Sequence, residues 1–164
     1  MGDPKKPRKK WEGPTHPWRK DVLLQELELI GKYGLRNKRE LWKAKTFLRR
    51  IRNQAREIMG LLPEERERRE RLLVQRLYRL GLVPSLDVTI DDILRLTVSD
   101  VLDRRLQVFV YKKGFAKSLY HARQLIVHGH ILVNDHRVTS PGYMVKREEE
   151  NNIRLALQLK NEGS

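Results

Sequence analysis

Basic and amide side chains gather between residues 105 and 137, where they could bind the phosphates and sugars of RNA. Apolar spacing there predicts a helix, a turn at Gly114, a second helix capped by Ser118 and a hairpin at Asn134-Asp135. This arrangement leaves the polar side chains on the outside of a small packed unit. The RNA-binding residues predicted in this stretch are Arg105, Lys112, Lys113, Lys117, Ser118, His121, Arg123, Gln124, His128, His130, Asn134 and Arg137.

Four histidines in the same stretch, His121, His128, His130 and His136, raise the alternative of a metal site or of acid–base catalysis. The chain has no cysteine, few carboxylates lie near these histidines, and no His-Glu-x-x-His spacing is present. The sequence also lacks a glycine-rich phosphate loop and a Gly-x-Ser-x-Gly elbow. We therefore predict no metal, no cofactor and no catalytic residue, hence a protein that is not an enzyme.

A helix predicted from residue 38 to residue 59 carries a second group of cations. Asn37 stands three residues before Glu40 as a capping-box-like start, apolar residues recur at steps of three and four, and Gly60 follows. A solvated helix face usually interleaves both signs of charge, whereas here only Glu57 opposes the cations. We therefore favour phosphate contact over a merely solvated face. The residues predicted to make it are Lys43, Lys45, Arg49, Arg50, Arg52 and Arg56.

The charge of the whole chain points to a polyanionic partner. Its 164 residues include 35 Lys and Arg against 21 Asp and Glu, which gives a net charge of +14 and a pI near 10.3. Residues 1–60 hold 17 basic and 7 acidic residues, residues 61–100 hold 7 and 8, and residues 101–145 hold 7 and 2. Two basic regions thus flank a neutral one, and nucleic acid is favoured over an acidic membrane. Because no 18-residue apolar run occurs, we expect no membrane segment and a cytoplasmic protein.

Further helices are predicted around these two basic regions. Asp21 is placed to cap a helix that ends at Gly34, and a helix from Pro63 to Leu80 alternates Glu with Arg on a solvated face. Thr-x-x-Asp starts at Thr89 and Thr97 predict two more helices. The second of these should run on through one apolar face from Val101 to Lys113.

Short strands should complete the C-terminal part. Residues 131–133 and 137–138 form the predicted hairpin, residues 143–145 a third strand, and the alternation of apolar residues from Ile153 to Leu159 a final strand. Glu148–Glu150 is most simply a solvated turn. The expected fold class is α+β, with a basic N-terminal helical region followed by a small αα-hairpin and β-sheet module.

The first 20 residues combine prolines with like charges, so we expect an arm that is flexible or extended when free. It could be a solubilising tail, but a cationic arm beside other basic surface is more often a phosphate contact. Trp11 and Trp18 lie within it without a core pattern around them. Either could stack on a base or pack against the helical domain.

The stretch from Arg105 to Asn134 resembles the S-four RNA-binding module, named after a ribosomal protein of the small subunit. That family's pattern is Arg-Leu-Asp, Gly-x-Ala-x-Ser-Arg, Ala-Arg-Gln-Leu-Ile, Gly-His and Val-Asn-Gly. This chain supplies Arg105-Leu106, Gly114-Phe115-Ala116-Lys117-Ser118, Ala122-Arg123-Gln124-Leu125-Ile126, Gly129-His130 and Val133-Asn134.

The chain departs from this pattern at Gln107 for Asp, Leu119 for Arg and Asp135 for Gly. Leu119 removes an expected cation, so the RNA face should rely more on neighbouring basic residues. Asp135 matters less, because Asp tolerates the left-handed turn conformation. Arg123 could have a structural role instead of an RNA contact, by pairing with Asp103 or Asp135.

Residues 33–42, the basic helix and residues 116–123 together resemble the archaeal and eukaryotic branch of the S-four ribosomal family. Without cysteine the chain cannot hold the zinc site of some bacterial members, and without the longer eukaryotic tail an archaeal source is expected. The resemblance implies a structural constituent of the small ribosomal subunit. It implies a primary binder of small-subunit ribosomal RNA that nucleates assembly at a multi-helix junction, as a monomer within the ribosome beside neighbouring small-subunit proteins.

The expected organisation is a basic flexible arm over 1–20, a helical N-terminal domain over 21–100, an S-four-type module over 101–150, and a C-terminal strand and tail over 151–164. Two other classes of function share such a module. A free RNA-binding chaperone or stress factor would differ in its target, and a modifying enzyme would need a catalytic domain for which the sequence offers no residues.

Overall fold

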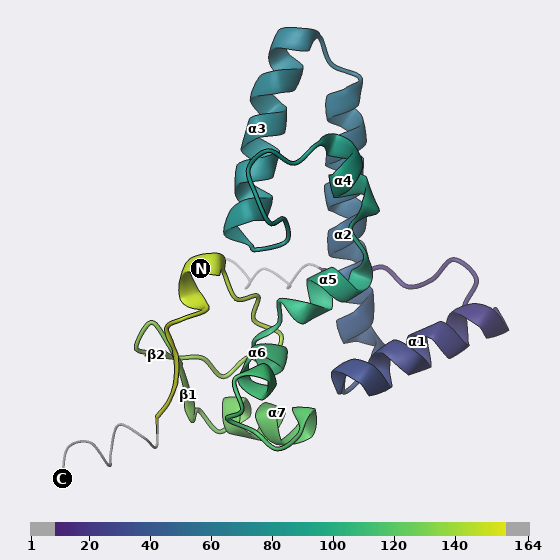
Figure 1. The fold of residues 1–164 in the computed structure, drawn as a ribbon. Coiled ribbons are helices and arrows are strands. Elements are labelled where there is room, and N and C mark those ends of the chain that lie inside the picture. The colour runs from purple at the N-terminus through teal and green to yellow at the C-terminus, as the bar shows by residue number, and fades with distance from the viewer. Residues whose placement is uncertain (1–8, 157–164) are drawn as a thin grey trace, which may run out of the picture.

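The structure is a computed structural model and describes residues 9–156. In Figure 1, helices α2 and α3 form a long antiparallel hairpin that projects from the rest, and α1 crosses the base of α2. The sheet, α6 and α7 lie at the same end as α1. The elements are α1 (Lys20–Tyr33), α2 (Lys38–Met59), α3 (Pro63–Arg79), α4 (Ile90–Arg95), α5 (Val98–Asp103), α6 (Leu106–Lys112), α7 (Leu119–Val127), β1 (Ile131–Val133), β2 (His136–Arg137), the 3-10 helix η1 (Arg147–Glu149) and β3 (Ile153–Leu155).

The first core lies along the apolar face of α2, which the periodicity of the sequence predicted. Its residues at steps of three and four are buried against α3, α4 and α5. Each end of the segment has the predicted cap: the Asn37 side chain accepts from the Glu40 backbone N–H at 3.2 Å, and Gly60 follows the last turn. The buried stripe of α2 is Leu41, Ala44, Leu48, Ile51, Ala55 and Ile58.

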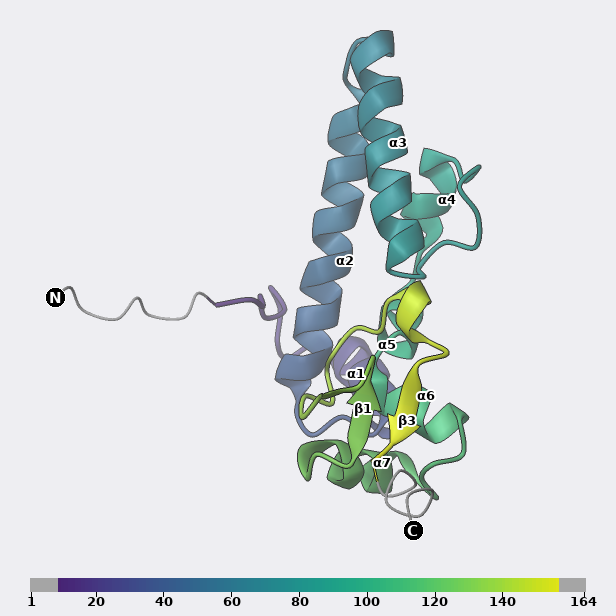
Figure 2. The same cartoon turned by 90° about the vertical axis from the view of Figure 1, so that its left-hand side faces the viewer.

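The second core joins α6 and α7 to the three-stranded sheet, whose strand order is β2-β1-β3 with both pairs antiparallel. Figure 2 shows β1 and β3 side by side, with α6 close behind them. Asn134 and Asp135 adopt left-handed φ values of 48° and 64°, which confirms the predicted tight turn between β1 and β2. The helical N-terminal part and this small α and β unit confirm the α+β fold class.

The single helix predicted from Val101 to Lys113 is wrong, because α5 ends at Asp103 and α6 begins at Leu106. Arg105 between them is extended, with φ −77° and ψ 142°, and forms an isolated antiparallel bridge with Met144. Val145 likewise donates its N–H to the Arg104 carbonyl at 2.9 Å. The break therefore lets the 140–145 segment pair with the backbone between the helices, which apolar periodicity within one segment does not reveal.

The strand predicted at residues 143–145 is also wrong, since this segment makes only that bridge. The final strand does form as β3, over Ile153–Leu155, and pairs with β1. The remainder of its predicted alternation, at Leu157 and Leu159, lies outside the described residues.

The acidic cluster Glu148–Glu150 is not a solvated turn, because only Glu148 is exposed. Glu149 is buried, and its carboxylate accepts the Tyr143 hydroxyl at 2.9 Å. Glu150 lies 2.7 Å from the Arg104 guanidinium. These two carboxylates therefore fasten η1 to the module.

Two predicted helix starts are confirmed and one differs in detail. Thr89 makes the complete capping box with Asp92, as predicted, and Ser118 caps α7 by accepting the His121 N–H at 3.2 Å. Asp21, however, lies inside the first turn of α1, whose N-cap is Arg19. The described part of the arm, residues 9–19, lies partly against α2: the ring centroids of Trp11 and Trp42 are 5.2 Å apart with their planes tilted by 31°, whereas Trp18 is 89% exposed. Residues 1–8 of the arm lie outside the described part.

No helix within residues 9–156 is long and apolar enough to cross a membrane.

Candidate nucleic-acid interface

The outer faces of α2 carry four of its six predicted cations in exposed positions, namely Lys43, Arg49, Arg50 and Arg56. Arg49 also contacts the Glu12 carboxylate. A solvated stretch of α2 therefore offers positive charge that opposing carboxylates only partly neutralise, as an RNA backbone requires.

The other two cations of α2 are engaged inside the fold. Lys45 Nζ lies 2.7 Å from Glu26 Oε1, and Arg52 donates to the Leu96 carbonyl at 2.6 Å. Glu26 is 1% exposed, and burial by itself raises the pKa of its carboxyl group. The hydrogen bond and the charge of Lys45 outweigh burial, so the pKa lies below its ordinary value. Lys45 therefore anchors α1 to α2, and Arg52 anchors α2 to the segment between α4 and α5.

The module exposes eight of its twelve predicted residues, and three of these also have an internal partner. Lys112 Nζ lies 3.0 Å from the Asp103 carboxylate, Ser118 caps α7, and Asn134 accepts from the Asn152 amide at 2.9 Å. His121 and His130 are half-buried. The exposed residues are Lys112, Lys113, Lys117, Ser118, Gln124, His128, Asn134 and Arg137.

The histidines do not assemble into a metal site. His128 and His130 stack with ring centroids 6.3 Å apart, and His121 Nδ1 accepts the Lys117 backbone N–H at 3.3 Å. Within residues 9–156 no three His, Cys, Asp or Glu side chains gather in a metal-binding group.

A groove of about 510 Å³ joins α2 to the module. Its walls combine the start of α2, residues of α5, and the 140–144 loop, so cations far apart in the sequence line one depression. The sequence prediction missed Lys10 and the loop as part of this surface, although Pro141-Gly142 did signal a turn. Its lining residues are Lys10, Glu40, Lys43, Ala44, Phe47, Arg50, Val101, Leu102, Arg105, Arg123, Ser140, Pro141, Gly142 and Met144.

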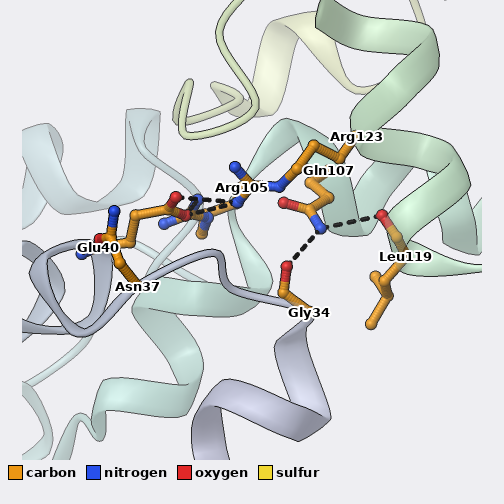
Figure 3. A network of polar contacts seen from close by, with 7 residues as sticks. All are labelled: Gly34, Asn37, Glu40, Arg105, Gln107, Leu119 and Arg123. Atoms are coloured by element: carbon orange, nitrogen blue, oxygen red, sulfur yellow. Dashed lines mark hydrogen bonds and ion pairs between the residues drawn. The ribbon is translucent and has the colours of Figure 1, made fainter.

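Glu40 lines this groove and holds two arginines of the module (Figure 3). Arg123 Nη2 donates to its two carboxylate oxygens at 2.7 and 3.0 Å, and Arg105 Nη2 contacts the same carboxylate. The side chains of Glu40 and Arg123 are 19% exposed, and that of Arg105 is 9% exposed. We call these three residues the Glu40 cluster.

The Glu40 cluster gives internal partners to two arginines that were predicted to contact RNA. Arg105 is turned into the protein toward Glu40, so its guanidinium is not presented on the surface as predicted. Arg123 has the structural role that the sequence left open, but its partner is Glu40 and neither Asp103 nor Asp135. Glu40 itself was predicted only as part of a helix cap. Its carboxylate instead contacts two residues of the module, Arg105 and Arg123, which lie 65 and 83 residues further along the chain.

The charged groups of the Glu40 cluster shift one another's pKa values. Burial raises the pKa of Glu40, but hydrogen bonds and charges of Arg123 and Arg105 outweigh it and hold that pKa below its ordinary value. Burial has the opposite effect on the pKa of Arg105, because it disfavours the charged guanidinium. The pKa of Arg105 is therefore lowered, although the Glu40 carboxylate opposes this effect. Glu40 is therefore ionised at neutral pH, and the two arginines and one carboxylate together keep a net positive charge.

Comparison with known proteins supports the resemblance seen in the sequence. Residues 3–103 match the family described as Ribosomal protein S4/S9 N-terminal domain, and residues 104–151 match the S4 domain. The "Small ribosomal subunit protein uS4" of Ignicoccus hospitalis is 60% identical over 156 residues, which is 95% of this chain and 93% of that protein. The proteins of the same name from Hyperthermus butylicus and Sulfurisphaera tokodaii are 56% and 59% identical, over 95% and 93% of this chain and 88% and 86% of their own lengths.

The chain belongs to the small ribosomal subunit protein uS4 family. These relatives are archaeal, in agreement with the branch to which the sequence was assigned. Members of the uS4 family are structural ribosomal proteins, so this chain is not an enzyme.

The structure explains two departures of this uS4 chain from the module pattern. The Gln107 amide, 0% exposed, donates to the Gly34 carbonyl and to the Leu119 carbonyl, both at 3.0 Å (Figure 3). Leu119 packs so closely on Gly34 that a Cβ at residue 34 would lie 2.9 Å from the Leu119 Cβ. Residue 119 is half-buried against the end of α1, a position that suits an apolar side chain better than the expected cation.

Proposed function

We propose that this uS4-family chain is a primary binder of small-subunit ribosomal RNA, which it contacts as a monomer to nucleate assembly at a multi-helix junction. Its place would be the small ribosomal subunit in the cytoplasm, beside other small-subunit proteins. The observation that carries this proposal is the groove in which cations of α2 meet the module.

The shape of the positive surface supports a folded RNA partner over a linear strand. Phosphates of helical RNA lie on both sides of a wide, shallow minor groove and are recognised largely by shape. Lys43 and Arg50 border the groove from α2, while the polar residues of α7 and of the β1–β2 turn extend the surface on the module. Two separated basic surfaces held in fixed orientation would read the geometry of a junction better than a base sequence.

We divide the predicted residues into two proposed roles. Arg105 and Arg123 position the two surfaces relative to each other through Glu40, and Lys45 and Arg52 hold α2 within the helical part, because each of the four has an internal partner and is buried or half-buried. Half-buried His121 and His130 border the contact surface. The proposed RNA contacts are Lys43, Arg49, Arg50, Arg56, Lys112, Lys113, Lys117, Ser118, Gln124, His128, Asn134 and Arg137.

The salt dependence of binding to a small-subunit junction RNA tests this proposal. Replacing Lys43 and Arg50 together by Ala should reduce the slope of log K against log salt by about 1.4 to 1.8 units, because each lost phosphate contact removes about 0.7–0.9. The matched control replaces Arg68 and Arg71 of α3 by Ala, since these arginines lie on a face that interleaves both charges. An unchanged slope in the Lys43 and Arg50 variant would remove the groove from the interface.

Sedimentation separates the ribosomal role from that of a stress factor with the same module. The wild-type chain should remain with small subunits through a salt-washed gradient. Association only with large subunits would contradict the proposed function.

A further inference from the structure

The groove between α2 and the module contains apolar surface that phosphate contacts do not require. Phe47 of α2 and Met144 of the 140–144 loop both line it, and both side chains are half-buried, so part of each remains accessible. Three residues of the first core complete the apolar lining, namely Ala44, Val101 and Leu102. Phosphates are bound by cations and hydrogen-bond donors. The apolar part of the groove therefore suits a different chemical group of the partner.

Phe47 lies between two cations on one face of α2. Lys43, Phe47 and Arg50 occupy positions i, i+4 and i+7, which share a face of a helix, and all three line the groove. We call these three residues the α2 stripe. Proteins that hold unpaired nucleotides combine an aromatic side chain, on which a base stacks, with cations that contact the phosphates. The α2 stripe has this composition.

Charge in the groove favours an anionic occupant. Its lining includes five cations and a single carboxylate, that of Glu40, which Arg105 and Arg123 already hold (Figure 3). The remaining cations of the lining are Lys10, Lys43 and Arg50. This excess of positive charge disfavours an apolar protein segment that carries basic side chains. A nucleotide matches both features, because it joins a flat apolar ring face to a negative phosphate.

The size of the groove agrees with a single nucleotide. Its volume of about 510 Å³ lies within the range of about 300–1,000 Å³ that is typical of pockets for small ligands. The bases of a paired RNA helix are stacked inside that helix, whereas unpaired bases of loops and bulges can turn out and stack on aromatic side chains. An unpaired nucleotide is therefore the part of a folded RNA that can place a base in this groove.

We propose that the groove holds one unpaired nucleotide of the small-subunit ribosomal RNA, with its base against Phe47 and its phosphates beside Lys43 and Arg50. Because every base has a flat face, the groove would accept any of the four with modest preference. This inference rests on the proposed function, and it adds a base contact to a surface otherwise proposed to contact phosphates.

Substitutions of Phe47 test the stacking contact in binding of the full-length protein to small-subunit ribosomal RNA. Phe47→Leu keeps an apolar side chain against the first core but removes the ring, so affinity should fall at least about fivefold. Phe47→Tyr keeps the ring and should stay within about twofold of wild type. The matched control is Phe109→Leu, at a half-buried phenylalanine of the second core outside the groove lining. Unchanged affinity in Phe47→Leu, or equal losses in the Leu and Tyr variants, would overturn the proposal.

Gly142→Leu fills the groove without altering the α2 stripe. Gly142 lines the groove, is exposed and lies outside the left-handed φ region, and its Cβ would lie at an ordinary contact distance of 3.5 Å from Arg105 Nη2. The fold should therefore accept the longer side chain, which would occupy space that the nucleotide needs. Affinity should again fall at least about fivefold, and an unchanged affinity would contradict the proposal.

Gly31→Leu is the matched control for this second variant. Gly31 is also exposed, but it lies on α1 outside the groove lining, where an added Cβ would meet open space. The affinity of Gly31→Leu for the same RNA should stay within about twofold of wild type. A loss as large as that of Gly142→Leu would show that blocking the groove is not the cause, and would overturn the proposal.

Photo-crosslinking identifies what occupies the groove. A benzophenone side chain placed at residue 47 of the full-length protein should link, in assembled small subunits, to a ribosomal RNA nucleotide whose base is unpaired. A link to another ribosomal protein, a link to a paired nucleotide or no link would each overturn the proposal. Wild-type protein that fails to bind small-subunit RNA would refute the proposed function and this inference with it. Normal wild-type binding with unchanged affinity in Phe47→Leu and Gly142→Leu would refute this inference alone.

Discussion

Glu40→Gln tests whether the Glu40 cluster holds the two basic surfaces together. The amide has the shape of the carboxylate and still accepts a hydrogen bond, but it leaves Arg105 and Arg123 side by side without a counter-charge. The backbone N–H that bonds to Asn37 is unaffected, so the cap of α2 remains. Any loss of stability therefore reports the charge that joins α2 to the module.

The expected loss is about 3 kcal/mol of unfolding free energy. Removing one partner of a buried ion pair costs about 3–5 kcal/mol, because the remaining charge is left uncompensated. We expect a loss at the lower end of this range for two reasons. The three side chains are 9–19% exposed to solvent, and the Gln side chain still accepts a hydrogen bond. With about 2–4 °C per kcal/mol for a chain of this size, Tm should fall by about 6–12 °C.

Stability measured against pH adds a second check on the same variant. Glu40 has a lowered pKa in the folded protein, so its stabilisation is complete above its ordinary pKa of 4.5 and is lost as the pH falls through the lower folded value. The difference between wild type and Glu40→Gln should therefore be largest near neutral pH and shrink progressively below pH 4.5.

Urea denaturation at several pH values measures both effects. The control is Glu67→Gln on α3, where the side chain is 72% exposed and the change should stay within about 0.5 kcal/mol. Adding Arg123→Gln to Glu40→Gln should destabilise less than the sum of the two single changes, because it also removes a repelling cation. A Glu40→Gln protein within about 1 kcal/mol of wild type at neutral pH would refute this reasoning.

Two further predictions concern the contact between Gly34 and Leu119. Gly34→Ala should lose about 2 kcal/mol in urea denaturation, since residue 34 has a φ of 57° and its Cβ would lie 2.9 Å from that of Leu119; stability equal to wild type would contradict this close packing. Leu119→Arg, which restores the cation of the module pattern, should lower stability by about 1–3 kcal/mol without increasing the affinity for junction RNA. A stable Leu119→Arg protein that binds this RNA more tightly would place residue 119 at the RNA.

Local signals in the sequence predicted most of the elements correctly. The apolar steps of α2, the Asn37 and Ser118 caps and the Asn134-Asp135 turn depend on residues within a few positions of one another, so their physical causes are visible in the chain itself. The break between α5 and α6 was missed because its cause is remote. The backbone at Arg105 pairs with Met144, and no pattern within residues 101–113 reports this contact.

The sequence by itself determined the basic character of this protein, its two regions of positive charge, its α+β class and the family to which it belongs. Only the tertiary structure decided which cations face solvent and which are bound inside. Arg105 and Lys43 are both basic residues on predicted helices, yet Arg105 meets Glu40 in a half-buried cluster and Lys43 borders an open groove. The reason is physical: a side chain's charge is set by its type, whereas the partner that neutralises it is set by packing between segments distant in the chain.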